Sequence, residues 1–309
     1  MALGERRRNP LMPRSTAEHM CALRAAGALE RDPAVRCPDE MAASFLGGLN
    51  ITTLAKRRAT RGLLLSGVDR RVPGVYTYEL MRVRFIDEIL LREVSAGLDE
   101  LILLGAGLDS RPYRLAEQLR GVRVIEVDHH ASQAFKRARV RRVCGREPEH
   151  VTFVEIDFTR DDLGTALAAA GHERSARTLF IWSGVSPYLP EAAVADVLSW
   201  VGAHPNPHAS IVFDACWAGA IDGSREYRGA AGWRRTVAGM GEPVLWGIPE
   251  GRVHETMASF GLRAERTLTV EEGRAAYLER SDGTLHDQPM DCFVLVQARA
   301  DPGPGSAAE

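Results

Sequence analysis

Several features are absent from this chain, and each absence excludes a class of protein. No apolar run reaches the roughly 20 residues that a membrane-spanning helix needs. The five cysteines are scattered and never form a Cys-x-x-Cys pair, which argues against disulfides and structural zinc. The formal net charge is only −2, so no global field favours nucleic acid or an anionic membrane. We therefore expect a cytoplasmic protein with a small-molecule partner, no nucleic-acid or membrane partner and no metal.

The two ends of the chain carry little structural information. Arg6, Arg7 and Arg8 form a basic cluster near the N-terminus, and no apolar stretch of signal-peptide length follows them. This pattern favours an unordered N-terminal tail over an export signal. The last residues, 301–309, read DPGPGSAAE and are expected to be disordered. The oligomeric state stays open between a monomer and a homodimer.

From about residue 98 onward, short aliphatic runs alternate with helical stretches. The runs begin at Leu101, Val122, Val151, Thr178 and Ala209, and two more follow at Leu262 and Cys292. Their apolarity is continuous rather than alternating, which predicts strands that are covered on both faces. Helices are expected between them, for example at 131–143, 190–203 and 271–279. The pattern predicts an α/β fold with a doubly wound, largely parallel sheet.

The first 95 residues have a helical rather than an alternating strand and helix pattern. Residues 16–29, 53–65 and 76–94 read as helices, so we expect a helical N-terminal cap over 1–95 and the main α/β domain over 96–300. Within that domain, residues 215–250 are irregular and contain Trp217, Trp233 and Trp246. Long irregular segments in compact domains are often functional. We interpret this segment as a lid over a substrate, although each tryptophan alone is more typical of a core.

A glycine turn follows the strand that begins at Leu101. Gly105 and Gly107 allow the backbone to turn sharply and to approach a bound nucleotide closely. Asp128 ends the next strand about twenty residues later, where a carboxylate can accept hydrogen bonds from ribose hydroxyls. Together these signals favour an adenosine ligand. The alternatives are a tight structural turn and a helix N-cap at Asp128.

The residues after the turn discriminate between two adenosine cofactors. A dinucleotide site has a third glycine or an alanine where this chain has Ser110, because the pyrophosphate must reach the helix N-terminus. The preceding residue, Asp109, would repel a pyrophosphate but would attract a sulfonium-bearing amino acid. The segment therefore favours S-adenosyl-L-methionine over NAD.

Two further positions carry both a functional and a structural interpretation. Asp157 ends the third strand and is followed by Phe158, so the pair could hold an adenine ring. Asp157 could equally belong to a helix cap, with Thr159 or Asp161 starting the next helix. Both interpretations of Asp157 stay open.

An arginine lies on the apolar face of the helix expected at 76–94. Arg82 shares that face with the aliphatic residues, whereas Arg84, Glu88 and Arg92 have the i, i+4 spacing of an ion-paired, solvated ladder. A buried cation needs an anion, because stranding it costs about 3 to 5 kcal/mol. The carboxylate of the cofactor could supply that charge. A structural Asp or Glu, or extension of the side chain to solvent, are the alternatives.

These residues lie in segments that resemble the leucine carboxyl methyltransferase-like family, which includes the tetracenomycin-type polyketide O-methyltransferases. The matching segments are R-x-R-F-I-D at 82–87, LLGAGLDSRPYRL at 103–115, EVD at 126–128 and WSGVSPYLPEAAV at 182–194. The resemblance implies a class I methyltransferase fold, in which a Rossmann-like sheet of seven strands carries an N-terminal helical cap. It also implies S-adenosyl-L-methionine as cofactor.

The resemblance further implies roles for individual residues. Arg82 would hold the cofactor carboxylate, Gly105 and Gly107 would face its amino-acid portion, Asp128 the ribose, and Asp157 with Phe158 the adenine. Tyr188 matches a tyrosine near the methyl-transfer region and is the candidate catalytic residue. Ser183 departs from the family pattern, which has a glutamate there, and Asp109 or a water could replace the lost carboxylate. His129 follows the EVD segment and is interpreted as an adenosine-flanking or surface residue.

The predicted function is methyl transfer to a small metabolite, most simply O-methylation of a carboxyl or hydroxyl group in natural-product biosynthesis. C- or N-methylation of a natural product is the alternative. An NAD-dependent oxidoreductase and a non-catalytic cofactor-binding protein are further possibilities. The sequence does not identify the methyl acceptor.

Overall fold

The computed structural model describes residues 15–46 and 58–301. The Arg6 to Arg8 cluster, the predicted tail at 301–309 except its first residue, and the first part of the helix expected at 53–65 lie outside this range. All seven predicted strands are present, each starting within one residue of its expected position. They are β1 (Glu100–Leu104), β2 (Arg123–Asp128), β3 (Val151–Glu155), β4 (Thr178–Trp182), β5 (Ser210–Cys216), β6 (Leu262–Leu268) and β7 (Phe293–Ala300).

The strands form one sheet in the order β3-β2-β1-β4-β5-β7-β6. The first five are parallel, and β7 is antiparallel to both of its neighbours, β5 and β6. The chain leaves β1 toward β2 and returns to β4 on the other side of β1. In such sheets a ligand crevice forms at this switch point, beyond the carboxyl ends of the strands.

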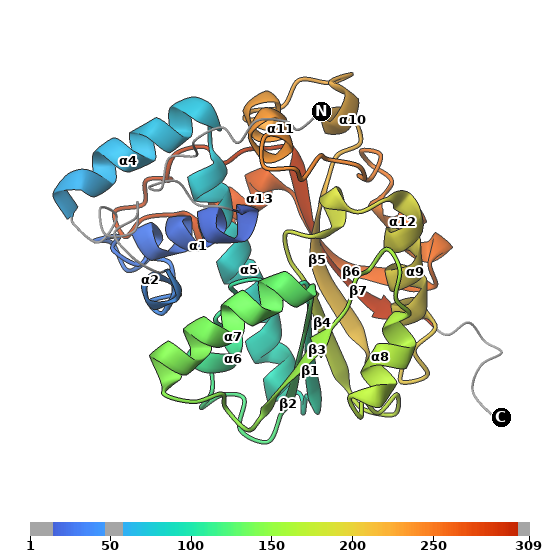
Figure 1. Cartoon of the computed structure of the whole chain (residues 1–309). Helices are drawn as coiled ribbons and strands as arrows, with labels where there is room; N and C mark the ends of the chain where they lie inside the picture. Colours follow the sequence, from blue (N-terminus) through green and yellow to red (C-terminus); the bar gives the residue numbers. More distant parts are fainter. Residues whose placement is uncertain (1–14, 47–57, 302–309) are drawn as a thin grey trace, which may run out of the picture.

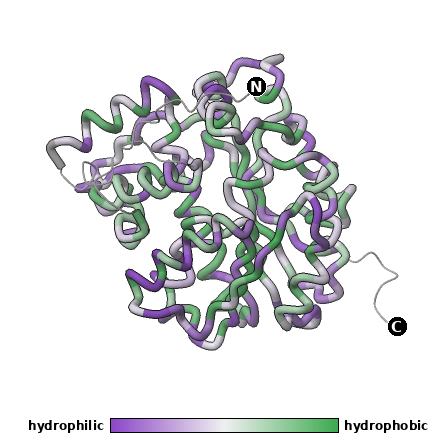
Figure 2. Tube along the Cα trace, viewed as in Figure 1, coloured by the Kyte–Doolittle hydropathy of each residue, from purple (hydrophilic) through white to green (hydrophobic). Residues whose placement is uncertain are grey.

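Helices cover both faces of the sheet. In Figure 1, α5 (Val75–Ser95), α6 (Arg111–Arg114) and α7 (His130–Cys144) lie on one side, and α8 (Leu163–Ala169), α9 (Glu191–Gly202) and α12 (Val253–Ser259) lie on the other. Successive residues of β1 pack on opposite faces of the sheet. Leu101 and Leu103 belong to one core cluster, and Ile102 and Leu104 belong to the other. Figure 2 shows the resulting hydrophobic band along the central strands. The doubly wound α/β prediction is confirmed.

The three helices predicted between the strands have observed counterparts whose ends differ by one or two residues. The stretch at 131–143 is α7, the stretch at 190–203 is α9, and the stretch at 271–279 is α13 (Val270–Tyr277). Neither of the two capping alternatives that the sequence left open is observed. Asp162, not Thr159 or Asp161, caps α8 and accepts a backbone N–H. His129, not Asp128, is the N-cap of α7.

Three helices from the N-terminal part lie beyond the end of the sheet, at the upper left of Figure 1. They are α1 (Thr16–Gly27), α2 (Ala42–Phe45) and α4 (Arg58–Arg71). The helix α4 continues past the predicted end at residue 65, because Leu64, Val68 and Val72 extend its apolar face at i+4 spacing. Pro73 then disfavours further helix. The helix α5 connects these helices to the sheet, since it packs on α1, α4 and β4.

The segment at 215–250 contains two helices, α10 (Gly219–Asp222) and α11 (Ala230–Ala238). After α11 the chain returns to the sheet, and the N–H groups of Leu245 and Trp246 donate to the carbonyl of Pro187. This carbonyl belongs to the loop that follows β4. The segment is thereby fixed beside the carboxyl edge of the sheet. No helix in the described ranges is both long and apolar enough to cross a membrane.

Candidate active site

A cavity of about 860 Å³ opens at the carboxyl ends of β1, β2 and β4. We call it the main cavity. Its wall is formed by the loops after these strands and by residues of α1, α4, α5 and α11. All ten site residues expected from the sequence line it: Arg82, Gly105, Gly107, Asp109, Asp128, His129, Asp157, Phe158, Ser183 and Tyr188.

The glycine turn has a backbone that other residues would adopt only with strain. Gly105 and Gly107 have φ values of 65° and 44°. A Cβ atom at Gly105 would lie 2.5 Å from a side-chain carbon of Val185. The N–H of Gly107 donates to Asp128 at 2.6 Å, and the second oxygen of Asp128 accepts the N–H of His129 at 2.7 Å. Burial raises the pKa of Asp128. Its carboxylate still has lone pairs that can accept from a ligand hydroxyl.

Asp109 is bound by the helix that follows the turn. One oxygen accepts the backbone N–H of Arg111 at 2.9 Å, and the other pairs with the Arg111 guanidinium at 2.5 Å. Burial alone would raise the pKa of Asp109, but the charges of Arg111, Lys136 and Arg24, together with the backbone hydrogen bond from Arg111, lower it to about 2. The start of α6 therefore already holds a carboxylate. A pyrophosphate would have to displace it.

Arg82 is buried and has two acidic partners. Its guanidinium contacts Glu79 at 2.5 Å and Asp214 at 2.8 Å. The buried charge is thus paired with acids of the protein itself, which was one of the alternatives given for Arg82. Burial would lower the pKa of Arg82, but the two carboxylates outweigh this and raise it. These two contacts use two of the five guanidinium N–H groups, which leaves donors for a ligand carboxylate. Arg82 also lies against Gly184, where a Cβ atom would be only 3.0 Å from its Nη1.

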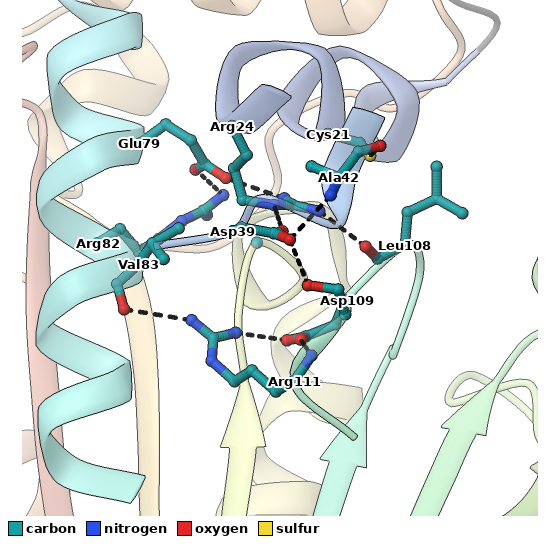
Figure 3. Close-up of polar contacts among 12 residues, drawn as sticks. Cys21, Arg24, Asp39, Ala42, Glu79, Arg82, Val83, Leu108, Asp109 and Arg111 are labelled. Carbon is teal, nitrogen blue, oxygen red and sulfur yellow. Dashed lines mark hydrogen bonds and ion pairs between the residues drawn. The ribbon is translucent and has the colours of Figure 1, made fainter. Parts of the chain in front are cut away.

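Arg24 is a polar residue of the site that our sequence reasoning missed. From α1 it pairs with Asp39 at 2.8 Å and Glu79 at 3.0 Å, and it donates to the carbonyl of Leu108 at 2.7 Å. Figure 3 shows Arg24 and Arg82 on either side of the shared Glu79. The same reasoning that singled out Arg82 applies to Arg24, which also lies within an apolar helical stretch.

Two of the motifs are joined by an ion-pair cluster. Asp87, at the end of the R-x-R-F-I-D segment, pairs with Arg111 at 2.8 Å and with Arg114 at 2.6 Å. Both arginines belong to the segment that follows the glycine turn. Asp87 therefore anchors α5 to the turn, and Arg111 links Asp87 to Asp109.

The ladder expected on α5 was wrong in its pairing but not in its exposure, because its side chains bind groups of other segments. Glu88 pairs with Arg266 of β6, and Arg84 donates to backbone carbonyls of the loop after α1. Arg92 donates to Gln297 of β7. Neighbouring segments provide these partners, while Glu88 and Arg92 keep the solvent exposure expected of them.

Asp157 and Phe158 lie together on the cavity wall. The carboxylate of Asp157 accepts both the N–H and the hydroxyl of Thr159, at 3.0 and 2.6 Å, and these hydrogen bonds lower its pKa. These contacts close a local turn rather than the helix cap that the structural interpretation offered, because α8 is capped by Asp162. Phe158 is half-buried and packs against the core cluster that contains α8 and α9. Its ring therefore has apolar support on one side.

Ser183 has a buried acid beside it that the sequence reasoning missed. The N–H of the next residue, Gly184, donates to Asp214 at 2.6 Å. Asp214 lies in β5 and is fully buried. The rule used for Asp128 and Asp157, an acid near a strand end, would also have identified it. A carboxylate is therefore present beside the serine position, whereas Asp109 is held by Arg111.

Tyr188 lies in a short 3₁₀ helix, η1 (Ser186–Tyr188), and its hydroxyl accepts the indole N–H of Trp233 at 3.1 Å. Burial raises the pKa of Tyr188. Trp233 lines the main cavity. Trp217 and Trp246 do not, and both are buried in the core cluster of the other sheet face.

The remainder of the wall is mostly apolar. It is contributed by α1, α4, α11 and the C-terminal strand region, through Met20, Leu23, Leu64, Val68, Val72, Val237, Met240, Met290 and Phe293. At its edge the hydroxyl of Thr16 donates to Glu242, which joins α1 to the segment after α11. Over the described residues, no group of three or more His, Cys, Asp or Glu side chains could hold a metal ion.

Comparisons with known proteins agree with this geometry. The profile of the family described as leucine carboxyl methyltransferase matches residues 17–202. A protein from Frankia alni is 36% identical over 191 residues, which cover 61% of this chain and 64% of the relative. A second protein from Frankia alni is 32% identical over 221 residues, which cover 70% and 76%. Both are described provisionally as S-adenosyl-L-methionine-dependent methyltransferases. The match thus spans slightly under two thirds of the first relative.

The fold recurs in a crystal structure from Thermobifida fusca, of a protein described provisionally as a methyltransferase. The two structures are 14% identical and have a TM-score of 0.52, and the alignment covers 85% of this chain and 94% of that one. This confirms the predicted class I methyltransferase fold. Because the family profile matches more than half of its residues, the chain belongs to the leucine carboxyl methyltransferase family.

Proposed function

We propose that this protein is an S-adenosyl-L-methionine-dependent methyltransferase that methylates an oxygen, carboxyl or hydroxyl, of a small molecule in natural-product biosynthesis. One observation carries the proposal. A single cavity joins the glycine turn and the acids near the strand ends to an apolar chamber under α1, α4 and α11. A cofactor and an acceptor could therefore lie end to end within it.

The residues at the sheet edge fit the cofactor. Arg82 retains guanidinium donors for its carboxylate, and Asp109 offers negative charge near its amino group. Asp128 would accept from the ribose hydroxyls, and Asp157 with Phe158 would border the adenine. His129 and Ser183 would complete the contacts. When bound, S-adenosyl-L-methionine supplies an electrophilic methyl group on a sulfonium.

The protein's main contribution is to align the acceptor and to exclude water, since methyl transfer is an in-line displacement. The apolar wall around Trp233 and Met290 fits a largely hydrophobic acceptor. The buried carboxylates of Glu79 and Asp214 are both held by Arg82, so neither is free to act as a base. A carboxyl acceptor is ionised at neutral pH and needs no base, which favours it.

Calorimetry with S-adenosyl-L-methionine, S-adenosylhomocysteine and NAD tests the cofactor. We expect binding of the first two and none of NAD. Transfer of a tritiated methyl group to a panel of carboxylic acids, phenols and amines then tests the reaction. Release of the label by mild alkaline hydrolysis would identify a carboxyl ester. Binding of NAD without S-adenosylhomocysteine would contradict the cofactor, and cofactor binding without transfer to any acceptor would indicate a non-catalytic binding protein.

A further inference from the structure

Tyr188 and Trp233 come from different elements and meet in the wall of the main cavity. The indole N–H of Trp233 donates to the Tyr188 hydroxyl at 3.1 Å, and the ring planes are inclined by 63°. An indole nitrogen can only donate, so the phenol oxygen must be the acceptor. The direction of this hydrogen bond is therefore fixed by chemistry.

The pair is held in place from both sides. Trp233 is 5% exposed and packs edge-on against Phe293, with ring centroids 4.7 Å apart. The carbonyl of Pro187, directly before Tyr188, accepts the N–H groups of Leu245 and Trp246 at 2.7 and 3.2 Å. The segment that carries Trp233 is thus attached to the turn that carries Tyr188. Neither ring can reorient without breaking these contacts.

The phenol proton of Tyr188 remains available. Among the described residues, none accepts it, because the only hydrogen bond to this hydroxyl is the one from Trp233. Burial raises the pKa of Tyr188, so the phenol stays protonated at neutral pH. Tyr188 therefore presents an oriented O–H donor on the wall of a cavity rather than a base.

We propose that Trp233 is a positioning residue for methyl transfer. By fixing the Tyr188 hydroxyl, it directs the phenol proton to an oxygen of the reacting group of the acceptor. When the acceptor oxygen is ionised, as in a carboxylate, one of its lone pairs forms the new O–C bond and its negative charge is lost. The electron pair of the broken S–C bond stays on sulfur and neutralises the sulfonium, so no proton has to leave. This inference rests on the proposed function and narrows the acceptors to molecules whose reacting group carries an oxygen.

A double-mutant cycle of Trp233→Phe and Tyr188→Phe tests this role. Activity is measured with tritiated S-adenosyl-L-methionine and four acceptors: octanoic acid, cinnamic acid, 2-naphthol and octylamine. We expect each single variant to lower kcat about tenfold with the best oxygen acceptor, and the double variant to be no slower than Tyr188→Phe. The affinity for S-adenosylhomocysteine should stay unchanged in all three. Trp217→Phe is the control, because Trp217 is also buried but lies outside the main cavity.

Several outcomes would overturn the inference. Additive losses of about a hundredfold in the double variant would mean that Trp233 acts independently of Tyr188. The inference would also be refuted if either single variant kept full activity or if Trp217→Phe lost as much activity as Trp233→Phe. Methyl transfer to octylamine alone would refute it as well. Calorimetry on each variant separates unfolding from a positioning defect. A wild-type protein that binds no S-adenosyl-L-methionine would refute the proposed function itself, whereas an active wild type with active variants would refute only the role of Trp233.

Discussion

Replacing Arg82 with methionine should weaken cofactor binding far more than replacing Arg84 in the same way. Arg82 lines the main cavity, whereas Arg84 lies on a separate surface groove and donates only to backbone carbonyls. Hydrogen bonds to charged groups contribute about 1.5 to 3 kcal/mol. Loss of the bond to the cofactor carboxylate should therefore raise the Kd of S-adenosyl-L-methionine roughly 10- to 150-fold. Arg84→Met should leave it within about twofold.

The same substitution should affect folding stability. Arg82→Met leaves Glu79 and Asp214 buried without their shared cation, and breaking a buried ion pair costs about 3 to 5 kcal/mol. The lower end is expected here, because Glu79 keeps Arg24 at 3.0 Å and Asp214 keeps the N–H of Gly184. Arg84→Met loses hydrogen bonds to neutral carbonyls, which should cost about 1 kcal/mol.

Calorimetry at a temperature where both variants are folded gives the two Kd values, and urea unfolding gives the two stability changes. Arg82→Lys is a useful intermediate, because it keeps the charge but loses the planar fork that binds a carboxylate through two N–H groups. Compared with Arg82→Met, Arg82→Lys should restore part of the free energy of unfolding and a smaller part of the affinity for S-adenosyl-L-methionine. Equal Kd values for Arg82→Met and Arg84→Met would refute the assignment of Arg82 to the cofactor.

Three further predictions follow from single contacts. Gly105→Ala should abolish cofactor binding in calorimetry, because its Cβ would lie 2.5 Å from Val185 at a φ of 65°. Gly97→Ala is the control and should not affect binding, because Gly97 also has a positive φ but open space around it. Asp87→Asn should lower stability by about 3 kcal/mol in urea unfolding, since it weakens two buried ion pairs; an unchanged midpoint would contradict this. Burial lowers the pKa of His204 from 6.5 to about 4. Between pH 4 and 6.5 the unfolded chain therefore binds more protons than the folded chain. The free energy of unfolding should rise with pH over this interval, by up to about 3 kcal/mol. His204→Asn should remove this rise when unfolding is compared at pH 4.5 and 7.5.

The sheet could be predicted because its physical signal is local. A strand covered on both faces needs apolar residues at consecutive positions, as Leu101 to Leu104 show, and this distinguishes it from an amphipathic helix. Helix ends were harder to place. The helix α4 continued because apolar residues recur to Val72, and α8 began at Asp162 because that side chain, rather than Thr159, reaches a free N–H.

The site was only partly predictable, because some of its residues acquire their roles through tertiary contacts. Acids near strand ends are recognisable in sequence, and Asp214 could have been found in this way. Glu79 and Arg24 could not be paired from spacing alone, since 55 residues separate them. The ladder on α5 failed for the same reason: an i, i+4 pair contributes only about 0.5 kcal/mol, and partners such as Arg266 replace it.

The three-dimensional site disfavours a dinucleotide for a different physical reason than the sequence does. From sequence, Asp109 counted against a pyrophosphate because like charges repel. In the structure this charge is largely balanced by Arg111, which Asp87 in turn holds in place, so repulsion alone is a weak discriminator. The stronger discriminator is that the backbone N–H at the start of α6 is already occupied. The carboxylate of Asp109 accepts the N–H of Arg111 there. A Gly-x-Gly turn followed by Asp-x-Arg thus closes the position where a pyrophosphate would bind, and leaves a paired carboxylate that can face an ammonium group instead.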